Sequence, residues 1–285
     1  MPKAQRASLE PNGSANGPSI PDLKATARVL RRHIIEMTHA AQSGHPGGSL
    51  SAIDMVTALY FGKMRHRPED PRWPDRDRFI LSKGHCCPAL YAALAQSGYF
   101  PVEELRTFRQ INSRIQGHAS VKTPGVEMSS GSLGQGLSFG VGTALALRLD
   151  GSTALTFVML GDGELDEGQV WEAAMAAKHY GLDNIVALVD RNGIQNDRAT
   201  KEVLDLEPIE DKWAAFGWET QVIDGHNMSS VVAALENAVS HPGPAAIVAD
   251  TTKGKGVSFM EGNADFHGKA PNREQYELAM KELAG

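Results

Sequence analysis

The segment Leu155-Thr-Phe-Val-Met-Leu160-Gly-Asp162-Gly-Glu164 decides the fold. Its nearly continuous apolar run is typical of a short strand that is buried on both faces. The glycines on either side of Asp162 allow a tight turn and let the backbone approach a ligand closely. A helical pattern begins near Glu167, and the free N–H groups at the start of a helix bind anions. The segment therefore predicts a strand, a turn and a helix, with an anion at the turn.

The same alternation of strand and helix runs along most of the chain. Further short apolar runs lie at residues 79–81, 185–189, 220–223 and 245–249. Apolar residues at helical spacing predict helices over residues 22–41, 49–61, 133–149, 168–180, 229–240 and about 272–283. This order predicts an α/β fold, with a parallel sheet and helices on both of its faces. Ligands of such sheets bind beyond the carboxyl ends of the strands, so the site is expected there.

Composition divides the chain into a short tail and one domain. Residues 11–18 read Pro-Asn-Gly-Ser-Ala-Asn-Gly-Pro, which is typical of a disordered segment. We therefore expect residues 1–21 to form a disordered N-terminal tail. No clear linker interrupts residues 22–285, which are expected to form a single domain.

Charge and cysteine content exclude several classes of protein. A net charge of −6 argues against nucleic-acid binding, which usually needs a basic surface. No apolar stretch approaches the roughly 20 residues of a membrane span. The cysteines are the adjacent pair Cys86 and Cys87, which cannot form a disulfide framework, so a reducing, cytoplasmic location is expected. We expect both thiols to be buried and inert rather than redox-active.

Asp162 is a poor direct partner for an anion, because its carboxylate adds negative charge. A carboxylate beside a phosphate is favourable when a hard cation lies between them, and Mg²⁺ commonly joins protein oxygens to phosphate oxygens. The next strand runs into Asp190-Arg-Asn192-Gly-Ile194, and one helix and one strand separate Asp162 from Asn192. The sequence thus predicts a magnesium site at Asp162, Asn192 and the Ile194 carbonyl, with Ca²⁺ or Mn²⁺ as substitutes.

Among the ten histidines, four that lie next to glycine in the chain are of particular interest and are expected on loops. They are His45, His85, His118 and His267. Histidine donates to phosphate or sugar oxygens and transfers protons near neutral pH. A single loop histidine is usually just a solvated side chain, but four beside a predicted phosphate and metal site favour a functional role.

Gly161-Asp-Gly163 followed by Asn192 resembles the fingerprint of thiamine diphosphate enzymes. Over residues 22–285 the chain resembles the N-terminal, diphosphate-binding part of transketolase. The segments that carry this resemblance follow the family's order: Ser43-Gly-His-Pro-Gly-Gly48, Leu81-Ser-Lys-Gly-His85, Gly117-His118, Ser130-Gly-Ser-Leu-Gly-Gln-Gly136, Gly161-Asp-Gly163, Asp190-Arg-Asn192, Lys253-Gly-Lys-Gly256 and His267-Gly268. Each segment is short, but the ordered set is specific. The resemblance implies a thiamine diphosphate-binding fold.

The resemblance also implies which residues hold the cofactor and the metal. Asp162, Asn192 and the Ile194 carbonyl resemble the magnesium ligands. The Gly131 carbonyl resembles the acceptor for the exocyclic amine of the cofactor, and Leu133 resembles the residue that packs against its rings. The full set of implied cofactor-binding residues is His85, Gly131, Leu133, Asp162, Gly163, Glu164, Asn192 and His267.

Catalytic roles follow from the same resemblance. His45, His118 and His267 resemble histidines that line the sugar channel, position hydroxyl groups and assist proton transfer. Glu167 and Glu172 resemble acidic residues at a subunit contact that links paired active sites. Of these two, Glu167 is expected to be a catalytic residue. The alternative for both glutamates is a solvated position on a helix.

The implied activity is transfer of a two-carbon ketol unit from a ketose, expected to be phosphorylated, to an aldose. In the family, a second domain binds the pyrimidine ring and supplies the glutamate that activates the cofactor. No segment after Gly285 supplies that domain, so the chain is expected to be the N-terminal subunit of a two-chain transketolase. The expected partner is a C-terminal subunit with the pyrimidine-binding domain and the activating glutamate, in a heterotetramer. The donor and acceptor sugars stay open.

Three departures from the family pattern and several alternatives remain. One departure is that Cys86-Cys87 replaces small residues beside His85. Arg198 stands where the family commonly has glycine, and Ala119-Ser120 follows His118 where Pro-Glu is common. The alternatives are a subunit like 1-deoxyxylulose-phosphate synthase or a 2-oxo acid dehydrogenase, and a non-catalytic, transketolase-like regulatory subunit. A nucleotide-dependent dehydrogenase is disfavoured, because no Gly-x-Gly-x-x-Gly follows a first strand.

Overall fold

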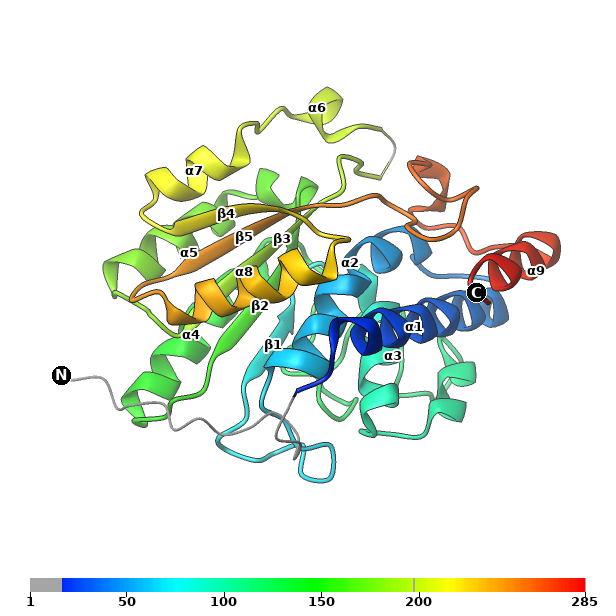
Figure 1. Ribbon diagram of the computed structural model, residues 1–285, viewed down its shortest axis with the longest axis horizontal. Coiled ribbons are helices and arrows are strands. Elements are labelled where there is room, and N and C mark those ends of the chain that lie inside the picture. The colour runs from blue at the N-terminus through cyan, green and yellow to red at the C-terminus, as the bar shows by residue number, and fades with distance from the viewer. Residues whose placement is uncertain (1–16, 197, 285) are drawn as a thin grey trace.

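A parallel sheet runs through the centre of the molecule (Figure 1). The computed structural model describes residues 17–196 and 198–284. Within them the strands are β1 (Arg78–Leu81), β2 (Thr156–Gly161), β3 (Ile185–Arg191), β4 (Glu219–Asp224) and β5 (Ala245–Asp250), in the order β1-β2-β3-β5-β4. All neighbouring strands are parallel. The predicted α/β fold and its predicted strands are confirmed.

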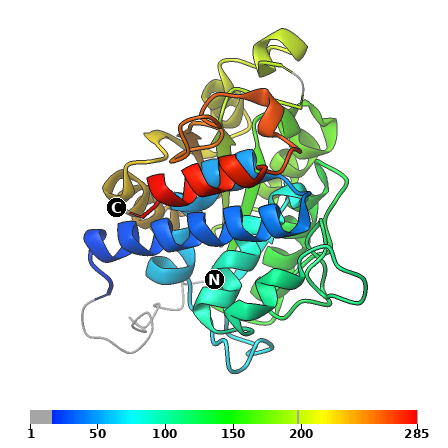
Figure 2. The same cartoon turned by 90° about the vertical axis from the view of Figure 1, so that its right-hand side faces the viewer.

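Helices cover both faces of this sheet. One layer consists of α1 (Ile20–Ala41), α2 (Pro46–Ala58), α3 (Cys87–Ser97), α8 (Met228–Ser240) and α9 (Arg273–Glu282). The other layer consists of α4 (Gln135–Leu149), α5 (Gly168–His179) and α7 (Ile209–Ala215). In Figure 2, α9 lies alongside α1 on the outside of the first layer. Among the described helices, none is both long enough and apolar enough to cross a bilayer.

Short helical pieces complete the connections. They are the π-helical turn η2 (Leu59–Lys63), the 3₁₀ turns η3 (Gly84–Cys86), η4 (Val102–Thr107), η5 (Gly163–Asp166) and η6 (Ala264–Phe266), and the single turn α6 (Thr200–Val203). Two of them, η3 and η5, directly follow the strands β1 and β2. They therefore belong to the edge of the sheet at which ligands are expected.

Alternating side chains of the strands build two separate cores. In β2, Phe157 and Met159 belong to the core under α1, α2 and α3, whereas Val158 and Leu160 belong to the core under α4 and α5. Because both faces of the strand are covered, every position must be apolar. This explains why the strand reads as a continuous apolar run.

The crossover from β2 through α5 to β3 brings the two polar segments together. Gly161 at the end of β2 pairs in register with Asp190 near the end of β3. The residues that follow these strands, Asp162 and Asn192, therefore leave the sheet at the same edge. This confirms the predicted βαβ relationship.

Three features of the helices differ from expectation. No periodicity predicted α3, because Cys87 to Ala95 are all buried and leave no polar face. Helix α2 begins at Pro46, earlier than the predicted residue 49, since Pro46 is favourable in the first turn. Helix α1 begins at Ile20, inside the expected tail, because Ser19 and Asp22 form a capping box. Residues 1–16 of that tail lie outside the described residues.

Two glycines of α4 have opposite environments. A Cβ atom on Gly140 would lie 2.5 Å from Val158 Cγ2, so the helix packs on β2 with no room for a side chain. A Cβ atom on Gly142 would meet nothing within 4 Å. The small residues of this helix therefore serve close packing within the domain at Gly140, while Gly142 faces outward.

We predict opposite effects of alanine at these two positions. Gly140→Ala forces α4 away from β2 and should lower the free energy of unfolding by about 1–3 kcal/mol. Gly142→Ala, its matched control, should raise it by about 1 kcal/mol, because alanine favours an exposed helix more than glycine does. Urea unfolding of both variants tests this packing, and equal effects at the two positions would contradict it.

Candidate cofactor and active site

A cavity of about 250 Å³ lies at the carboxyl ends of β2 and β3. Several elements contribute to it: the start of α2, the segment after β1, and the loops after β2, β3 and β5. Of the residues that the sequence singled out, the cavity is lined by His85, Leu133, Asp162, Gly163, Glu164, Asn192, Ile194 and His267. Segments far apart in the chain thus converge on one site.

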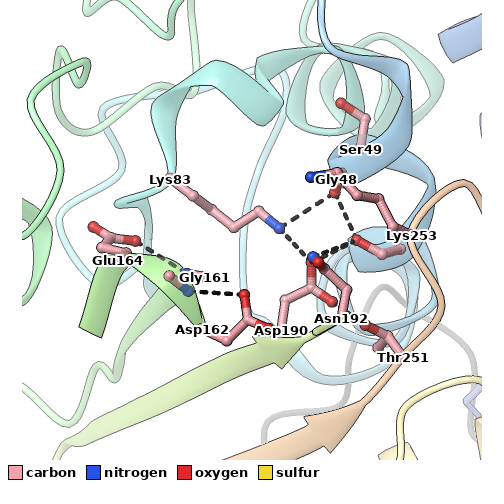
Figure 3. Close-up of polar contacts among 12 residues, drawn as sticks. Gly48, Ser49, Lys83, Gly161, Asp162, Glu164, Asp190, Asn192, Thr251 and Lys253 are labelled. Carbon is pink, nitrogen blue, oxygen red and sulfur yellow. Dashed lines mark hydrogen bonds and ion pairs between the residues drawn. The ribbon is translucent and has the colours of Figure 1, made fainter. Parts of the chain in front are cut away.

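Lys83, which lines this cavity, forms a buried ion pair with Asp190 (Figure 3). Both side chains are almost fully enclosed, with exposures of 2% and 0%. Burial alone would raise the pKa of Asp190, but the Lys83 ammonium and hydrogen bonds from neighbouring side chains hold it below its usual range. Burial would likewise lower the pKa of Lys83, but Asp190 raises it above its usual value. Asp190 is therefore already neutralised by Lys83.

Asp190 accepts further hydrogen bonds from three elements. The Ser51 hydroxyl of α2 donates to Oδ2 at 2.6 Å, and the Asn192 amide donates to the same oxygen at 3.2 Å. The Thr251 hydroxyl, just beyond β5, donates to Oδ1. These contacts fix Asn192 with its nitrogen toward Asp190, and its oxygen accepts from the Ile194 N–H at 3.2 Å.

Asp162 and the segment after β3 are in direct contact. The Gly193 N–H donates to Asp162 Oδ2 at 2.6 Å, and the Gly163 N–H donates to Oδ1 at 2.8 Å. Burial and the nearby Asp190 raise the pKa of Asp162 to about 6, despite these hydrogen bonds. A raised carboxylate pKa reflects an environment that lacks compensating positive charge.

The oxygens around Asp162 suit a hard divalent cation. Asp162 contributes a carboxylate, Asn192 an amide oxygen and Ile194 a main-chain carbonyl, all lining the same cavity. The Ile194 carbonyl also accepts from the Lys253 ammonium at 2.9 Å. Oxygen donors of this kind match magnesium or calcium. The described residues contain no cluster of three or more His, Cys, Asp and Glu side chains able to hold a metal.

The Glu164 side chain joins two of the segments that form the site. Its carboxylate accepts from the Ser82 hydroxyl, from the Gly134 N–H at 2.9 Å and from the Gly161 N–H at 3.0 Å. It therefore ties the turn after β2 to the loop before α4, which carries Leu133. Because its carboxylate already accepts these hydrogen bonds, we expect Glu164 to contact a bound phosphate through its backbone.

Four histidines cluster beside the cavity, and two of them, His85 and His267, line it. The His45 ring lies 5.2 Å from His85, 5.4 Å from His267 and 6.2 Å from His118, between ring centroids. His85 and His267 are stacked at 5.1 Å. They come from four separate segments, so only the fold brings them together. His45, His118 and His267 lie on loops as expected, whereas His85 lies in the 3₁₀ turn η3.

The surroundings keep this cluster neutral. Burial lowers the pKa of His45 to about 4, with contributions from Arg109, His118 and Lys253. Burial and the adjacent Lys253 lower the pKa of His267 to about 3. The pKa values of His85 and His118 are lowered as well, again mainly by burial. A neutral imidazole offers one donor and one acceptor, which suits binding and proton transfer at sugar hydroxyls.

Other predicted residues lie outside the cavity lining. A Cβ atom on Gly131 would lie 3.8 Å from His118, so this glycine adjoins the histidine cluster. Glu167 packs against Gly134 and is exposed, as is Glu172 on α5. The exposed positions of both glutamates are compatible with a subunit contact and also with a solvated helix.

The loop after Asn192 and the cysteines also have defined places. The Gln195 N–H donates to the Arg198 carbonyl at 3.0 Å, and the Arg198 side chain is exposed. Cys86 and Cys87 are buried free thiols, as expected, and burial raises the pKa of both. Elevated thiol pKa values agree with an unreactive pair.

Sequence reasoning assigned no role to Lys83, Asp190 or Lys253. Lys253 is buried, and its ammonium donates to the carbonyls of Ile194 and Gln195, both at 2.9 Å, and lies 2.8 Å from His267 Nδ1. Burial and the nearby Lys83 lower its pKa to about 8. The glycine-rich segment Lys253-Gly-Lys-Gly256 was the available signal, but the contact of Lys253 with the carbonyl of Ile194, about 60 positions away, is visible only in the fold.

Comparison with known proteins finds the same family that the sequence motifs resemble. The family described as transketolase, thiamine diphosphate binding domain, matches residues 23–284. A 6-deoxy-6-sulfo-D-fructose transketolase subunit of Clostridium sp. (strain MSTE9) is 47% identical, over 92% of this chain and 96% of that protein. One subunit of the apulose-4-phosphate transketolase of Phocaeicola vulgatus is 43% identical, over 92% of this chain and 94% of its own length. The crystal structure of Campylobacter jejuni transketolase superposes with a TM-score of 0.88 and 33% identity, over 93% of this chain and 43% of that one.

We predict that Lys83→Met is strongly destabilising, because it leaves the buried Asp190 carboxylate without its counter-ion. Loss of one partner of a buried pair typically lowers the free energy of unfolding by about 3–5 kcal/mol. The double variant Lys83→Met/Asp190→Asn removes the stranded charge and should be more stable than Lys83→Met alone. Denaturant unfolding decides this, and a double variant less stable than the single one would rule out the stranded charge as the cause.

We also predict a pH effect of His45. Its pKa is about 4 in the folded chain, against about 6.5 for an ordinary histidine. Between these values the unfolded chain binds more protons than the folded chain, so stability falls as the pH is lowered. His45→Gln should therefore lose less thermal stability than the wild type between about pH 7 and pH 5. His179→Gln, at an exposed histidine, is the matched control; identical pH profiles of wild type and His45→Gln would refute the assignment.

Proposed function

The chain belongs to the transketolase family, by its thiamine diphosphate-binding domain, and on this basis we propose that it is the N-terminal subunit of a two-chain transketolase. The proposed reaction transfers a two-carbon ketol unit from a ketose to an aldose. The observation that carries the proposal is the convergence of Asp162, Asn192 and Ile194 with the histidine cluster around one cavity. This convergence supports a site in which a metal, a diphosphate and a sugar would lie side by side.

We assign the metal and the diphosphate to the deep part of the cavity. Asp162, Asn192 and the Ile194 carbonyl would hold Mg²⁺, or Ca²⁺ or Mn²⁺ in its place. Gly163, the Glu164 backbone, His85 and His267 would contact the diphosphate, and Lys253 supplies a cation there. Leu133 and the Gly131 carbonyl would hold the ring portion. Residues 22–285 would thus form one diphosphate and metal domain.

When bound, thiamine diphosphate supplies a nucleophilic carbon and an electron sink for cleavage of a bond next to a carbonyl. The role of this chain is to orient the sugar and move protons. Neutral His45 and His118 can each donate to one sugar oxygen and accept from another. A proton leaving a hydroxyl group can thereby be accepted at a ring nitrogen. The pKa of His45, at about 4, keeps one of its ring nitrogens unprotonated at neutral pH. The Nδ1 of His267 lies 2.8 Å from the Lys253 ammonium, so His267 is left with its Nε2–H to donate.

We propose that a C-terminal subunit completes the site. It would carry the pyrimidine-binding domain and the activating glutamate, and two copies of each chain would form a heterotetramer. Two relatives of matching length are named as transketolase subunits, which supports a divided enzyme. Exposed Glu167 and Glu172 would lie at the contact between the paired sites.

The sugar substrates are proposed only as a class. The two related subunits are named for 6-deoxy-6-sulfo-D-fructose and for apulose-4-phosphate, both with an anionic group. A phosphorylated or similarly anionic ketose is therefore our expected donor, either in pentose phosphate metabolism or in a specialised pathway. The free, buried thiols Cys86 and Cys87 are compatible with a cytoplasmic enzyme.

The test is made on the chain purified with its partner chain. Asp162→Asn removes the charge of the proposed metal ligand with little change of size. It should weaken Mg²⁺-dependent binding of thiamine diphosphate and lower ketol transfer by at least about 100-fold. Calorimetry measures the first effect and an assay of sugar products measures the second.

Two controls make the test specific. Asp211→Asn, the same substitution at an exposed residue of α7, should leave both quantities unchanged. This chain without its partner should show no ketol transfer. Absence of cofactor binding in the wild-type complex, or undiminished binding by Asp162→Asn, would reject the proposed function. A pyruvate-decarboxylating activity would favour the alternative related to 1-deoxyxylulose-phosphate synthase.

A further inference from the structure

The loop after β5 delivers Lys253 to the cavity, but groups outside the cavity hold that loop. The Thr252 N–H donates to His226 Nε2 at 2.8 Å, and the Lys255 carbonyl accepts from Arg31 Nε at 3.1 Å. Lys253 lies between these two anchors. The position of its ammonium is therefore constrained from both sides along the chain.

The hydrogen-bond partners of His226 define its tautomer. Because Nε2 accepts from a backbone N–H, the ring proton must lie on Nδ1. His226 Nδ1 is 2.8 Å from Asp54 Oδ2, so it donates to that carboxylate. Asp54 thus orients the imidazole with its acceptor nitrogen toward Thr252.

Asp54 connects the two anchors of the loop. It is 6% exposed, and the Arg31 guanidinium donates to both of its oxygens, at 3.1 Å and 2.6 Å. The same Arg31 holds the Lys255 carbonyl, and the same Asp54 orients His226. One buried carboxylate on α2 therefore organises both ends of the segment that carries Lys253. Bidentate Arg–carboxylate contacts give such an arrangement a fixed geometry.

We infer that Asp54 and His226 are positioning residues, which set the place of the Lys253 ammonium in the cavity without touching it. The inference rests on the proposed function, because Lys253 is assigned there to the diphosphate. The geometry is specific: His226 acts through the Thr252 N–H, one residue from Lys253. Loss of the Nε2 acceptor should therefore matter more than loss of the Nδ1 donor.

Two substitutions separate these two roles of His226. In His226→Gln the side-chain oxygen reaches the place of Nε2, so Thr252 keeps its acceptor while the bond to Asp54 is lost. In His226→Asn the shorter amide reaches the place of Nδ1, so Asp54 keeps its donor while Thr252 loses its acceptor. Each variant loses one hydrogen bond, so similar stabilities are expected.

The readout is binding of thiamine diphosphate with Mg²⁺ by calorimetry, on the complex of this chain and its partner. His226→Asn should weaken binding by about tenfold, the effect of one lost hydrogen bond transmitted to Lys253. His226→Gln should bind within about twofold of the wild type. The matched control is His241→Asn, at the end of α8 and away from the loop. Equal weakening by Asn and Gln, or none by either, would overturn the inference.

A double-mutant cycle shows whether His226 acts through Lys253. In a Lys253→Met background, His226→Asn should have no further effect on binding. An undiminished effect there would mean that His226 acts by another route, and would overturn the inference. Hydrogen exchange at the Thr252 amide gives a cofactor-independent check, since it should accelerate in His226→Asn and not in His226→Gln. Failure of the wild-type complex to bind the cofactor would instead reject the proposed function, and the exchange data would then decide whether the loop is positioned as inferred.

Discussion

The site depends on the neutralisation of Asp190 within the protein. This carboxylate lies at the carboxyl end of β3, next to the end of β2, and is fully buried. Lys83, which follows β1, supplies the counter-ion, and Ser51 and Thr251 add hydrogen bonds from α2 and from beyond β5. A buried ion pair requires such extra donors, because coulombic attraction alone rarely compensates for desolvation. The same contacts lock four segments together at the edge of the sheet.

This neutralisation gives the two neighbouring aspartates different properties. Asp190 has a lowered pKa and directs Asn192, whereas burial and Asp190 raise the pKa of Asp162 to about 6. Two carboxylates in contrasting environments take contrasting roles, as is common in enzyme sites. Asp190 is a fixed structural group, and Asp162 is the carboxylate that still gains from an added cation. Asp162 was predicted from the sequence as a metal ligand, and its properties depend on Asp190, to which the sequence analysis assigned no role.

The sequence predicted those parts of the site that depend on local pattern. Continuous apolar runs located the strands, and the spacing from Asp162 to Asn192 predicted that they would meet. Lys253 and His226 were not predictable in this way, because their partners lie on segments remote in sequence. Helix α3 was missed for a different reason: burial on all sides leaves no periodicity to detect.

The acidic residues of the cavity bear on the need for a partner. Among the described lining residues, the carboxylates are those of Asp162 and Glu164. Glu164 accepts three hydrogen bonds that hold the turn after β2 and the loop before α4. Asp162 accepts two backbone N–H groups and faces the proposed metal. Neither carboxylate can act on a cofactor ring without losing the hydrogen bonds that hold the loops around the proposed diphosphate site. Under the proposed function, the activating glutamate would therefore come from outside the described part of this chain, in line with the proposed second subunit.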